Sequence, residues 1–347
     1  MRRVIVGLIL AFTVAQHAFA ESGEGLNVSI ALFDPGIPED KSVHRELNVF
    51  PRIRNIEAMF LPFVVHDALR ESGEWGAIRI VPETDPAAEL LIRGRIEHSD
   101  GATLRLHINA VDATGRVWID RPYTGDVTDG YADDDEEITE SHEPLYAAIV
   151  NDLSRVLDEL SYKDKVTIAE VSLLRYGHEV APAAFGEFVS VTPDGAVTIN
   201  RLPATDDPMI QRIALVRETE YVITDAMDTR FRELSVEIAS VYDIWREFRR
   251  KTLKYAQEDL RRAEATLDDG SPGSYESLKS AYDNYRYHRI TEQEQDRLAV
   301  AFYTEVGPRV EAMEEQVDEM QDWVDAKYAE WRRILEEFFE LEADFGG

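Results

Sequence analysis

The sequence predicts an α+β protein: a small antiparallel or mixed sheet with two packed helices, followed by a long antiparallel helical bundle or coiled-coil hairpin. Two observations give this prediction. Between residues 27 and 120, apolar and polar side chains alternate along several short segments, which is the two-residue period of a half-buried strand. From residue 208 onward, apolar side chains recur in alternating steps of three and four, the period of packed helices.

The first twenty residues have the pattern of a secretory signal. Arg2 and Arg3 precede an apolar run over residues 4–15, and alanines occupy positions 18 and 20. We therefore expect a periplasmic protein whose signal is cleaved after Ala20, with a retained anchor as the alternative. The run has 12 residues, short of the ~20 that cross a bilayer, so direct membrane insertion is not expected. Because the chain has no cysteine, we expect neither a lipoprotein nor disulfides.

Residues 21–162 are predicted to form an α+β sandwich domain. Its first strand is expected over residues 27–33, where Val28, Ile30 and Leu32 share a face. In the helix that follows, Asn55 is the candidate N-cap and Pro62 marks a kink or the true start. Gly73 is placed to end this helix in a left-handed conformation.

The next segments predict a meander of antiparallel strands. Arg93 and Arg95 alternate with apolar residues, so both should lie on the polar face, and we take them as candidate interaction residues. A compact turn at residues 99–101 joins two strands, and an acidic loop over 126–143 leads into a helix at about 144–160. The predicted strands cover residues 78–81, 89–98, 102–111 and 116–120.

Three stretches of this domain carry a resemblance to a known family. They read "HDALRESGEW", "LLIRGRIEHSDGATLRLHINAVDATG" and "YAAIVNDLSRVLDEL". Together they resemble the amino-terminal domain of TolB-type periplasmic proteins, an anticodon-binding-like fold also seen in penicillin-binding-protein activator and curli-secretion lipoproteins. The resemblance covers residues 26–162 and implies a non-catalytic domain that docks envelope partners. It implies that Trp75 seals a corner between helix and sheet, with stacking on a ligand as the alternative.

The chain departs from that family beyond the domain. TolB-type proteins continue into a propeller of repeated blades, and no blade repeat is present in this sequence. The connector over residues 163–207 is predicted to hold short helices, one capped by Thr167 and Glu170, and a small hairpin around 192–195. In the connector, Arg201 beside Asp206 and Asp207 is interpreted as a structural clasp, with a ligand site as the alternative.

Residues 208–347 are predicted to form a long-helix bundle or coiled-coil arm. Asp207 as N-cap and Pro208 at the first helical position begin this part. Two stretches have heptad spacing and should form its apolar seam. The predicted seam residues are Phe231, Leu234, Ile238, Val241, Trp245 and Phe248 in the first long helix, and Val317, Met320, Val324, Trp331, Ile334 and Phe338 in the last.

Charge is distributed unevenly along these helices. Residues 245–262 hold seven basic side chains against three acidic ones, and residues 310–345 hold thirteen acids against three bases. We therefore expect the basic helix to pack beside the acidic terminal helix. The whole chain has a formal net charge of -31, which makes nucleic acid and anionic membranes poor partners because both would repel it.

No motif for covalent, metal or cofactor chemistry is recognised. The segments "HEPLY" and "HEVAP" lack the second histidine of a zinc-binding helix, and we predict no catalytic residue, metal or cofactor. The leading hypothesis is therefore a non-catalytic periplasmic binding or scaffold protein that docks envelope proteins. One alternative is an envelope enzyme, such as a wall-glycan hydrolase with two carboxylates. The other is a homo-oligomeric structural protein assembled through the heptad stripes.

Overall fold

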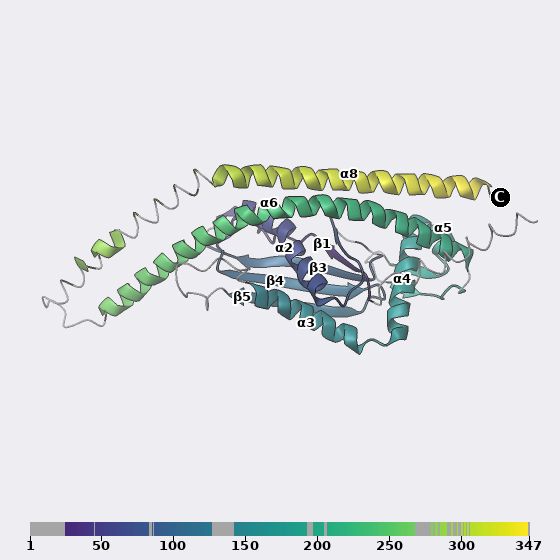
Figure 1. Cartoon of the computed structure of the whole chain (residues 1–347), viewed down its shortest axis with the longest axis horizontal. Helices are drawn as coiled ribbons and strands as arrows, with labels where there is room; N and C mark the ends of the chain where they lie inside the picture. The colour runs from purple at the N-terminus through teal and green to yellow at the C-terminus, as the bar shows by residue number, and fades with distance from the viewer. Residues whose placement is uncertain are drawn as a thin grey trace, which may run out of the picture.

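The computed structural model describes residues 25–44, 46–82, 85, 87–126, 142–192, 197–204, 207–267 and 306–345, with some positions between 279 and 304. It confirms the α+β prediction: helices pack on one five-stranded sheet, and two long antiparallel helices lie along that assembly (Figure 1). Within the described residues, no helix combines the length and the apolar character that crossing a membrane requires.

The sheet is mixed, with strand order β2-β1-β3-β4-β5. The first strand pairs in parallel with both neighbours, so β2 lies outside the predicted meander. The remaining pairs are antiparallel, which confirms the meander for β3, β4 and β5. A β-bulge interrupts the register of β3 and β4 between Ile96 and His98. The strands are β1 (Val28–Ala31), β2 (Ile78–Val81), β3 (Leu90–Ser99), β4 (Thr103–Asp112) and β5 (Val117–Asp126).

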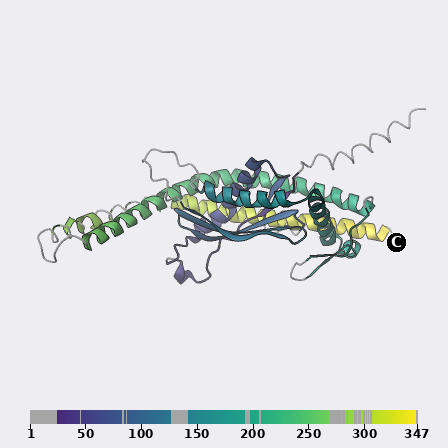
Figure 2. The ribbon, with the colours of Figure 1, turned by 90° about the horizontal axis from the view of Figure 1, so that it is seen from below.

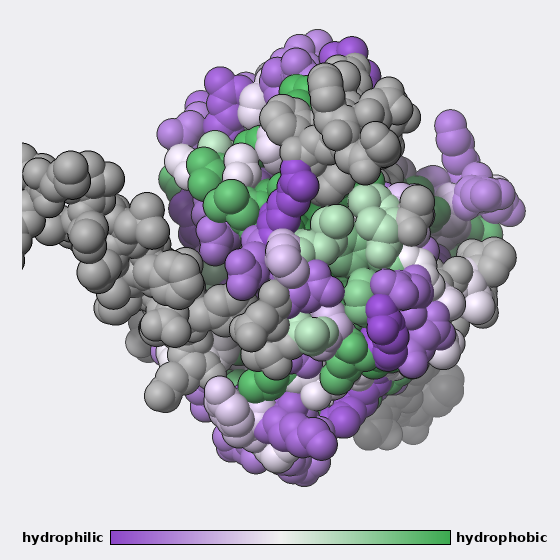
Figure 3. Space-filling model, turned by 90° about the vertical axis from the view of Figure 1, so that its right-hand side faces the viewer, coloured by the Kyte–Doolittle hydropathy of each residue, from purple (hydrophilic) through white to green (hydrophobic). Residues whose placement is uncertain are grey.

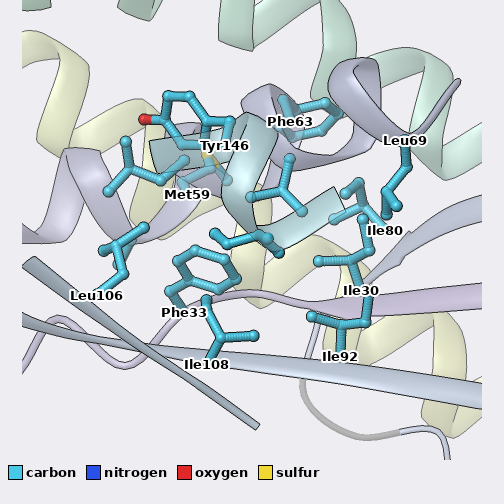
Figure 4. Packing of buried hydrophobic residues seen from close by; sticks show 14 of the residues in the cluster. Ile30, Phe33, Met59, Phe63, Leu69, Ile80, Ile92, Leu106, Ile108 and Tyr146 are labelled. Carbon is cyan, nitrogen blue, oxygen red and sulfur yellow. The ribbon is translucent and has the colours of Figure 1, made fainter. Parts of the chain in front are cut away.

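Helices α2 (Pro51–Ser72) and α3 (Glu143–Glu159) cover one face of this sheet. The core between them is a continuous apolar cluster; Ile30, Phe33, Met59, Phe63 and Ile108 are among the residues labelled in Figure 4. Gly94 is required in β3 because a Cβ there would lie 2.6 Å from the ring of Phe33.

Helix α2 starts earlier than predicted. Asn55 is not its N-cap, because the helix begins at Pro51 with Phe50 in the cap position. Pro62 lies inside the helix and cannot donate to the carbonyl of Ala58. That carbonyl instead accepts a hydrogen bond of 2.9 Å from the Phe33 amide, which ties the chain after β1 to the helix. Gly73 ends the helix with φ 69°, as predicted.

The connector contains α4 (Tyr162–Val180), α5 (Pro182–Phe185) and the short hairpin of β6 (Val189–Val191) with β7 (Val197–Ile199). The hairpin was predicted, but the helix cap was not: Ser161 and Asp164 form the capping box, rather than Thr167 and Glu170. Thr167 and Glu170 are the sixth and ninth residues of α4, inside the helix rather than at its start.

Helix α6 (Pro208–Leu267) and helix α8 (Gly307–Phe345) form the long antiparallel pair. As predicted, α6 begins at Pro208, where Asp207 accepts a hydrogen bond of 2.9 Å from the Met209 amide. The helix also closes one edge of the sheet, since the Asp228 carboxylate accepts from the Ile80 amide of β2 at 3.4 Å. Covering an edge strand in this way removes a template for unwanted pairing.

The heptad stripe of α6 packs on α2 through aromatic contacts. Ring centroids are 6.3 Å apart for Phe63 and Phe231 and 6.0 Å for Phe50 and Trp245. The first two-thirds of α6 therefore lies on the sandwich. Beyond Arg249 the helix continues for 18 residues, which corresponds to about 27 Å, past the end of the sheet (Figure 1).

Helix α8 packs antiparallel beside α6, as predicted for the basic and acidic helices, but the basic segment of α6 does not lie beside the acidic residues. Phe248 stacks on Phe302 with centroids 4.4 Å apart, while the Arg230 guanidinium lies 4.7 Å from the Trp323 ring. In this register the basic segment lies beside residues that precede α8, and the acidic helix lies beside earlier turns of α6. The acidic helix also packs on α2, where Arg52 is 3.1 Å from Glu311.

Candidate functional site

The outer face of β3, β4 and β5 carries the polar side chains of the meander. Helices α2 and α3 lie on the opposite face, and Figure 2 shows the sheet below this helix layer. Arg93 and Arg95 are exposed on the outer face, as their alternation predicted. In the register of the sheet, Arg93 faces Asn109 and Arg95 faces His107.

Most charges on this outer face are paired. Arg105 lies 2.7 Å from Glu97, His107 lies 2.8 Å from Asp120, and Arg95 lies 3.6 Å from Asp34. The hydrogen bond from His107 lowers the pKa of Asp120 below its usual value. No described carboxylate lies within 4.0 Å of the Arg93 guanidinium, so Arg93 is the cation that this face presents to solvent. The outer face thus presents exposed charges, most of them held in fixed pairs.

Trp75 lies in the turn between α2 and β2 and is partly buried against the main core. Its ring centroid is 6.2 Å from that of Trp118, and the Trp118 indole donates a hydrogen bond of 2.9 Å to Asp112. The indole of Trp75 therefore packs beside the β5 end of the sheet, a position that suits the corner role.

The predicted clasp between Arg201 and the pair Asp206 and Asp207 is not the arrangement that the structure shows for Arg201 and Asp207. Arg201 lies 2.8 Å from Glu187 and 4.8 Å from the ring of Phe188, so it ties the end of β7 to the segment before β6. Asp207 caps α6. Asp206 lies outside the described residues.

The predicted seam residues are mostly buried within the chain itself, against α2 and between the two long helices. Phe248 and Met320 are half-buried, and so is Trp331. Ile334 is exposed, and the side chain of Phe338 lies outside the described part. The fully buried members are Phe231, Leu234, Ile238, Val241, Trp245, Val317 and Val324.

A buried ionic cluster, which we did not predict, joins α6 to the sandwich. Arg54 and Glu57 on α2 are 1% and 0% exposed, with Nε and Oε2 4.0 Å apart. The Ser99 hydroxyl at the end of β3 donates to Glu57, and Arg54 donates to the Ile96 carbonyl at 3.0 Å. From α6, the buried Tyr242 interacts electrostatically with Glu57. We call Arg54, Glu57, Ser99, Tyr242 and Arg246 the Glu57 cluster.

Burial raises the pKa of Glu57, while the bonds from Ser99 and the charges of Arg54 and Arg246 oppose that rise. A raised carboxylate pKa is typical of general acids. However, a side chain with no exposed surface cannot reach a substrate, so the arrangement serves to hold α2, β3 and α6 together. The sequence feature that could have indicated this buried cluster is the Arg54–Glu57 pair, which lies on an otherwise apolar helix face.

His142, the N-cap residue of α3, lies close to this cluster and is also buried. Burial lowers its pKa to about 4, and the positive charge of Arg246 acts in the same direction. Asp100 and Asp126 oppose the shift more weakly. The imidazole is therefore neutral at pH 7.

A second ionic cluster fixes the start of α6 to the sheet. Arg217 is buried, lies 2.7 Å from Asp85, and stacks over the rings of Tyr176 and Tyr221 at 4.5 and 4.8 Å. On β2, Arg79 lies 2.7 Å from Asp225 of α6. The long helix is thus attached by ionic groups near both ends of its contact with the sandwich.

In the described residues, no group of three or more histidine, aspartate or glutamate side chains is arranged to hold a metal ion. The comparisons with known proteins add no further assignment, since no family model, curated protein or solved structure matches the chain.

Proposed function

We propose that the protein is a non-catalytic binding or scaffold protein of the cell envelope, exported by its first twenty residues and acting through protein–protein docking. The observation that carries this proposal is the outer face of β3, β4 and β5. It is a polar surface on a rigid sheet, with Arg93 exposed and the neighbouring ions held in pairs. Preformed, fixed charges favour recognition of a complementary surface.

Two further features support docking. The resemblance of residues 26–162 to TolB-type amino-terminal domains implies an envelope protein that binds partners. In addition, helix α6 extends about 27 Å beyond its hydrogen bond from Arg249 to the sandwich. The projecting part of α6 offers a second docking surface, at a distance from the outer face of β3, β4 and β5.

The proposal is tested by site-specific photocrosslinking in living cells. A photoreactive residue in place of Asn109, beside Arg93, should give a discrete adduct, and the Arg93→Glu substitution in the same chain should abolish it. A probe in place of Asp158, which is exposed on α3, is the matched control. Equal adducts from both probes, or adducts that persist with Arg93→Glu, would contradict docking at this face.

Export has its own test. Cell fractionation of the full chain should place it in the periplasm at the mass expected after cleavage at Ala20. A chain that lacks residues 2–20 should stay in the cytoplasm. If both chains fractionate alike, the envelope assignment is wrong, whereas the docking face is judged by the crosslinks.

A further inference from the structure

Two polar atoms of the Glu57 cluster face each other without a hydrogen bond. Arg54 Nε and Glu57 Oε2 are both buried, and neither atom has a hydrogen-bond partner among the described residues. They lie 4.0 Å apart, too far for a direct bond. Neighbouring atoms of the same side chains are bonded elsewhere, since Arg54 Nη1 donates to the Ile96 carbonyl and Glu57 Oε1 accepts from Ser99. Closing the gap would therefore bend or break one of these bonds.

The separation of Arg54 Nε and Glu57 Oε2 suits one bridging oxygen atom. An oxygen about 2.8 Å from each of two atoms that are 4.0 Å apart sees them at an angle of about 90°. This angle lets a water molecule accept from Nε and donate to Oε2. Internal waters in proteins occupy sites of this kind, between buried polar groups that would otherwise stay unpaired.

Two further unpartnered atoms lie around the same cluster. Arg246 Nε on α6 and His142 Nδ1 at the start of α3 are buried, and they too have no hydrogen-bond partner in the described part of the chain. The charge of Arg246 acts on both Glu57 and His142, so these groups are neighbours. Hydrophilic side chains gather at the rim of the face shown in Figure 3, whereas these four side chains are buried.

The concentration of unpartnered atoms at one place calls for a common explanation. Of the eight such side-chain atoms among the described residues, four belong to this place. Nearly all buried polar atoms in proteins have a partner, and an ordered water or ion is a usual one where the protein supplies none. The residues around the gap therefore define a site for a small polar ligand.

The mixture of charges around the gap decides which ligand the site takes. An anion would lie against the Glu57 carboxylate, and a cation would lie against the guanidinium groups of Arg54 and Arg246. Water avoids both repulsions because it accepts from a guanidinium and donates to a carboxylate. We propose that one internal water molecule bridges Arg54 Nε and Glu57 Oε2, where α6 covers α2. It completes the hydrogen bonding of the ion pair while both side chains keep their other bonds.

A crystal structure of the chain tests the site directly. At a resolution where ordered waters are visible, a density peak should lie within about 3.2 Å of both Arg54 Nε and Glu57 Oε2. Crystals grown in sodium bromide should give no anomalous peak at this position, because the carboxylate repels anions. A direct bond between the two atoms, a gap without density, or bromide in the gap would each overturn the proposal.

Magnetic relaxation dispersion of the solvent tests the site in solution, because its amplitude counts the waters held inside a protein. Arg54→Met with Glu57→Leu removes both partners and should reduce the amplitude by the share of one water molecule. Apolar replacement of a buried ion pair often leaves a protein folded. The matched control is Arg52→Met with Glu311→Leu, an exposed ion pair of α2 and α8, which should leave the amplitude unchanged. Equal amplitudes in the two double variants would contradict the internal water.

Discussion

Arg249 of α6 donates a hydrogen bond of 3.0 Å from Nε to the carbonyl of Asp100, in the tight turn that joins β3 and β4. The turn approaches the helix closely because the next residue is Gly101, with φ 89°. A Cβ at position 101 would lie 2.5 Å from the Cβ of Arg249. Among the described residues, this contact is the last hydrogen bond from α6 to the sandwich before the helix extends past the sheet.

Gly101→Ala should therefore lower the free energy of unfolding by about 2–4 kcal/mol, through left-handed strain and displacement of α6. Gly115→Ala is the matched control, since φ is 88° there and the added Cβ meets nothing within 4 Å. It should cost about 1 kcal/mol through strain alone. Denaturant unfolding of both variants measures the difference, and equal losses would show that α6 does not restrain the turn.

Glu57→Ala should destabilise the protein by about 3–5 kcal/mol, because it leaves the buried Arg54 charge without its carboxylate. Glu97→Ala removes the exposed partner of Arg105 and should change stability by less than about 1 kcal/mol. Thermal and denaturant unfolding compare the two variants. Similar losses would mean that the Glu57 cluster is not the anchor between α2 and α6.

Stability should fall as the pH drops from about 6.5 toward 4, because of His142. Its pKa is lowered to about 4 in the folded chain, so between these values the unfolded chain binds a proton that the folded chain does not. Through proton linkage, the free energy of unfolding falls by as much as about 3 kcal/mol at pH 4. His142→Gln should flatten the profile in this window, while His44→Gln should not. A profile unchanged by His142→Gln would assign the acid sensitivity to other groups.

Phe231→Ala should lower the free energy of unfolding by about 3–5 kcal/mol, since it opens a cavity between α6 and α2. Val300→Ala truncates a side chain that is 66% exposed on the returning segment, and it should change stability by no more than about 0.5 kcal/mol. Chemical denaturation of the two variants shows whether the heptad stripe of α6 is core. Comparable small effects would contradict its burial against α2.

The sheet and the long helices could be predicted because each has its own period in the sequence. Arg93 and Arg95 were placed on the polar face by simple alternation, and Asp207 with Pro208 marked the start of α6 correctly. The start of α2 was missed because Pro62 reads as a helix breaker. In the folded chain the Ala58 carbonyl that it leaves free is taken by Phe33, a residue 25 positions earlier.

The ionic contacts could not be predicted in the same way. Arg54 and Glu57 have the spacing of an ordinary surface pair, and only the packing of α6 over them makes them buried. The two long helices were predicted to be neighbours, but charge could not give their register. The actual register is set by Phe248 with Phe302, and the acids of α8 meet Arg52 of α2 instead.

Helix α6 runs without a break from Pro208 to Leu267, and the same rod therefore forms both the brace of the sheet edge and the projecting arm. Because α6 is one continuous helix, the direction of the arm is set by the contacts that Asp228 and Asp225 make with β2.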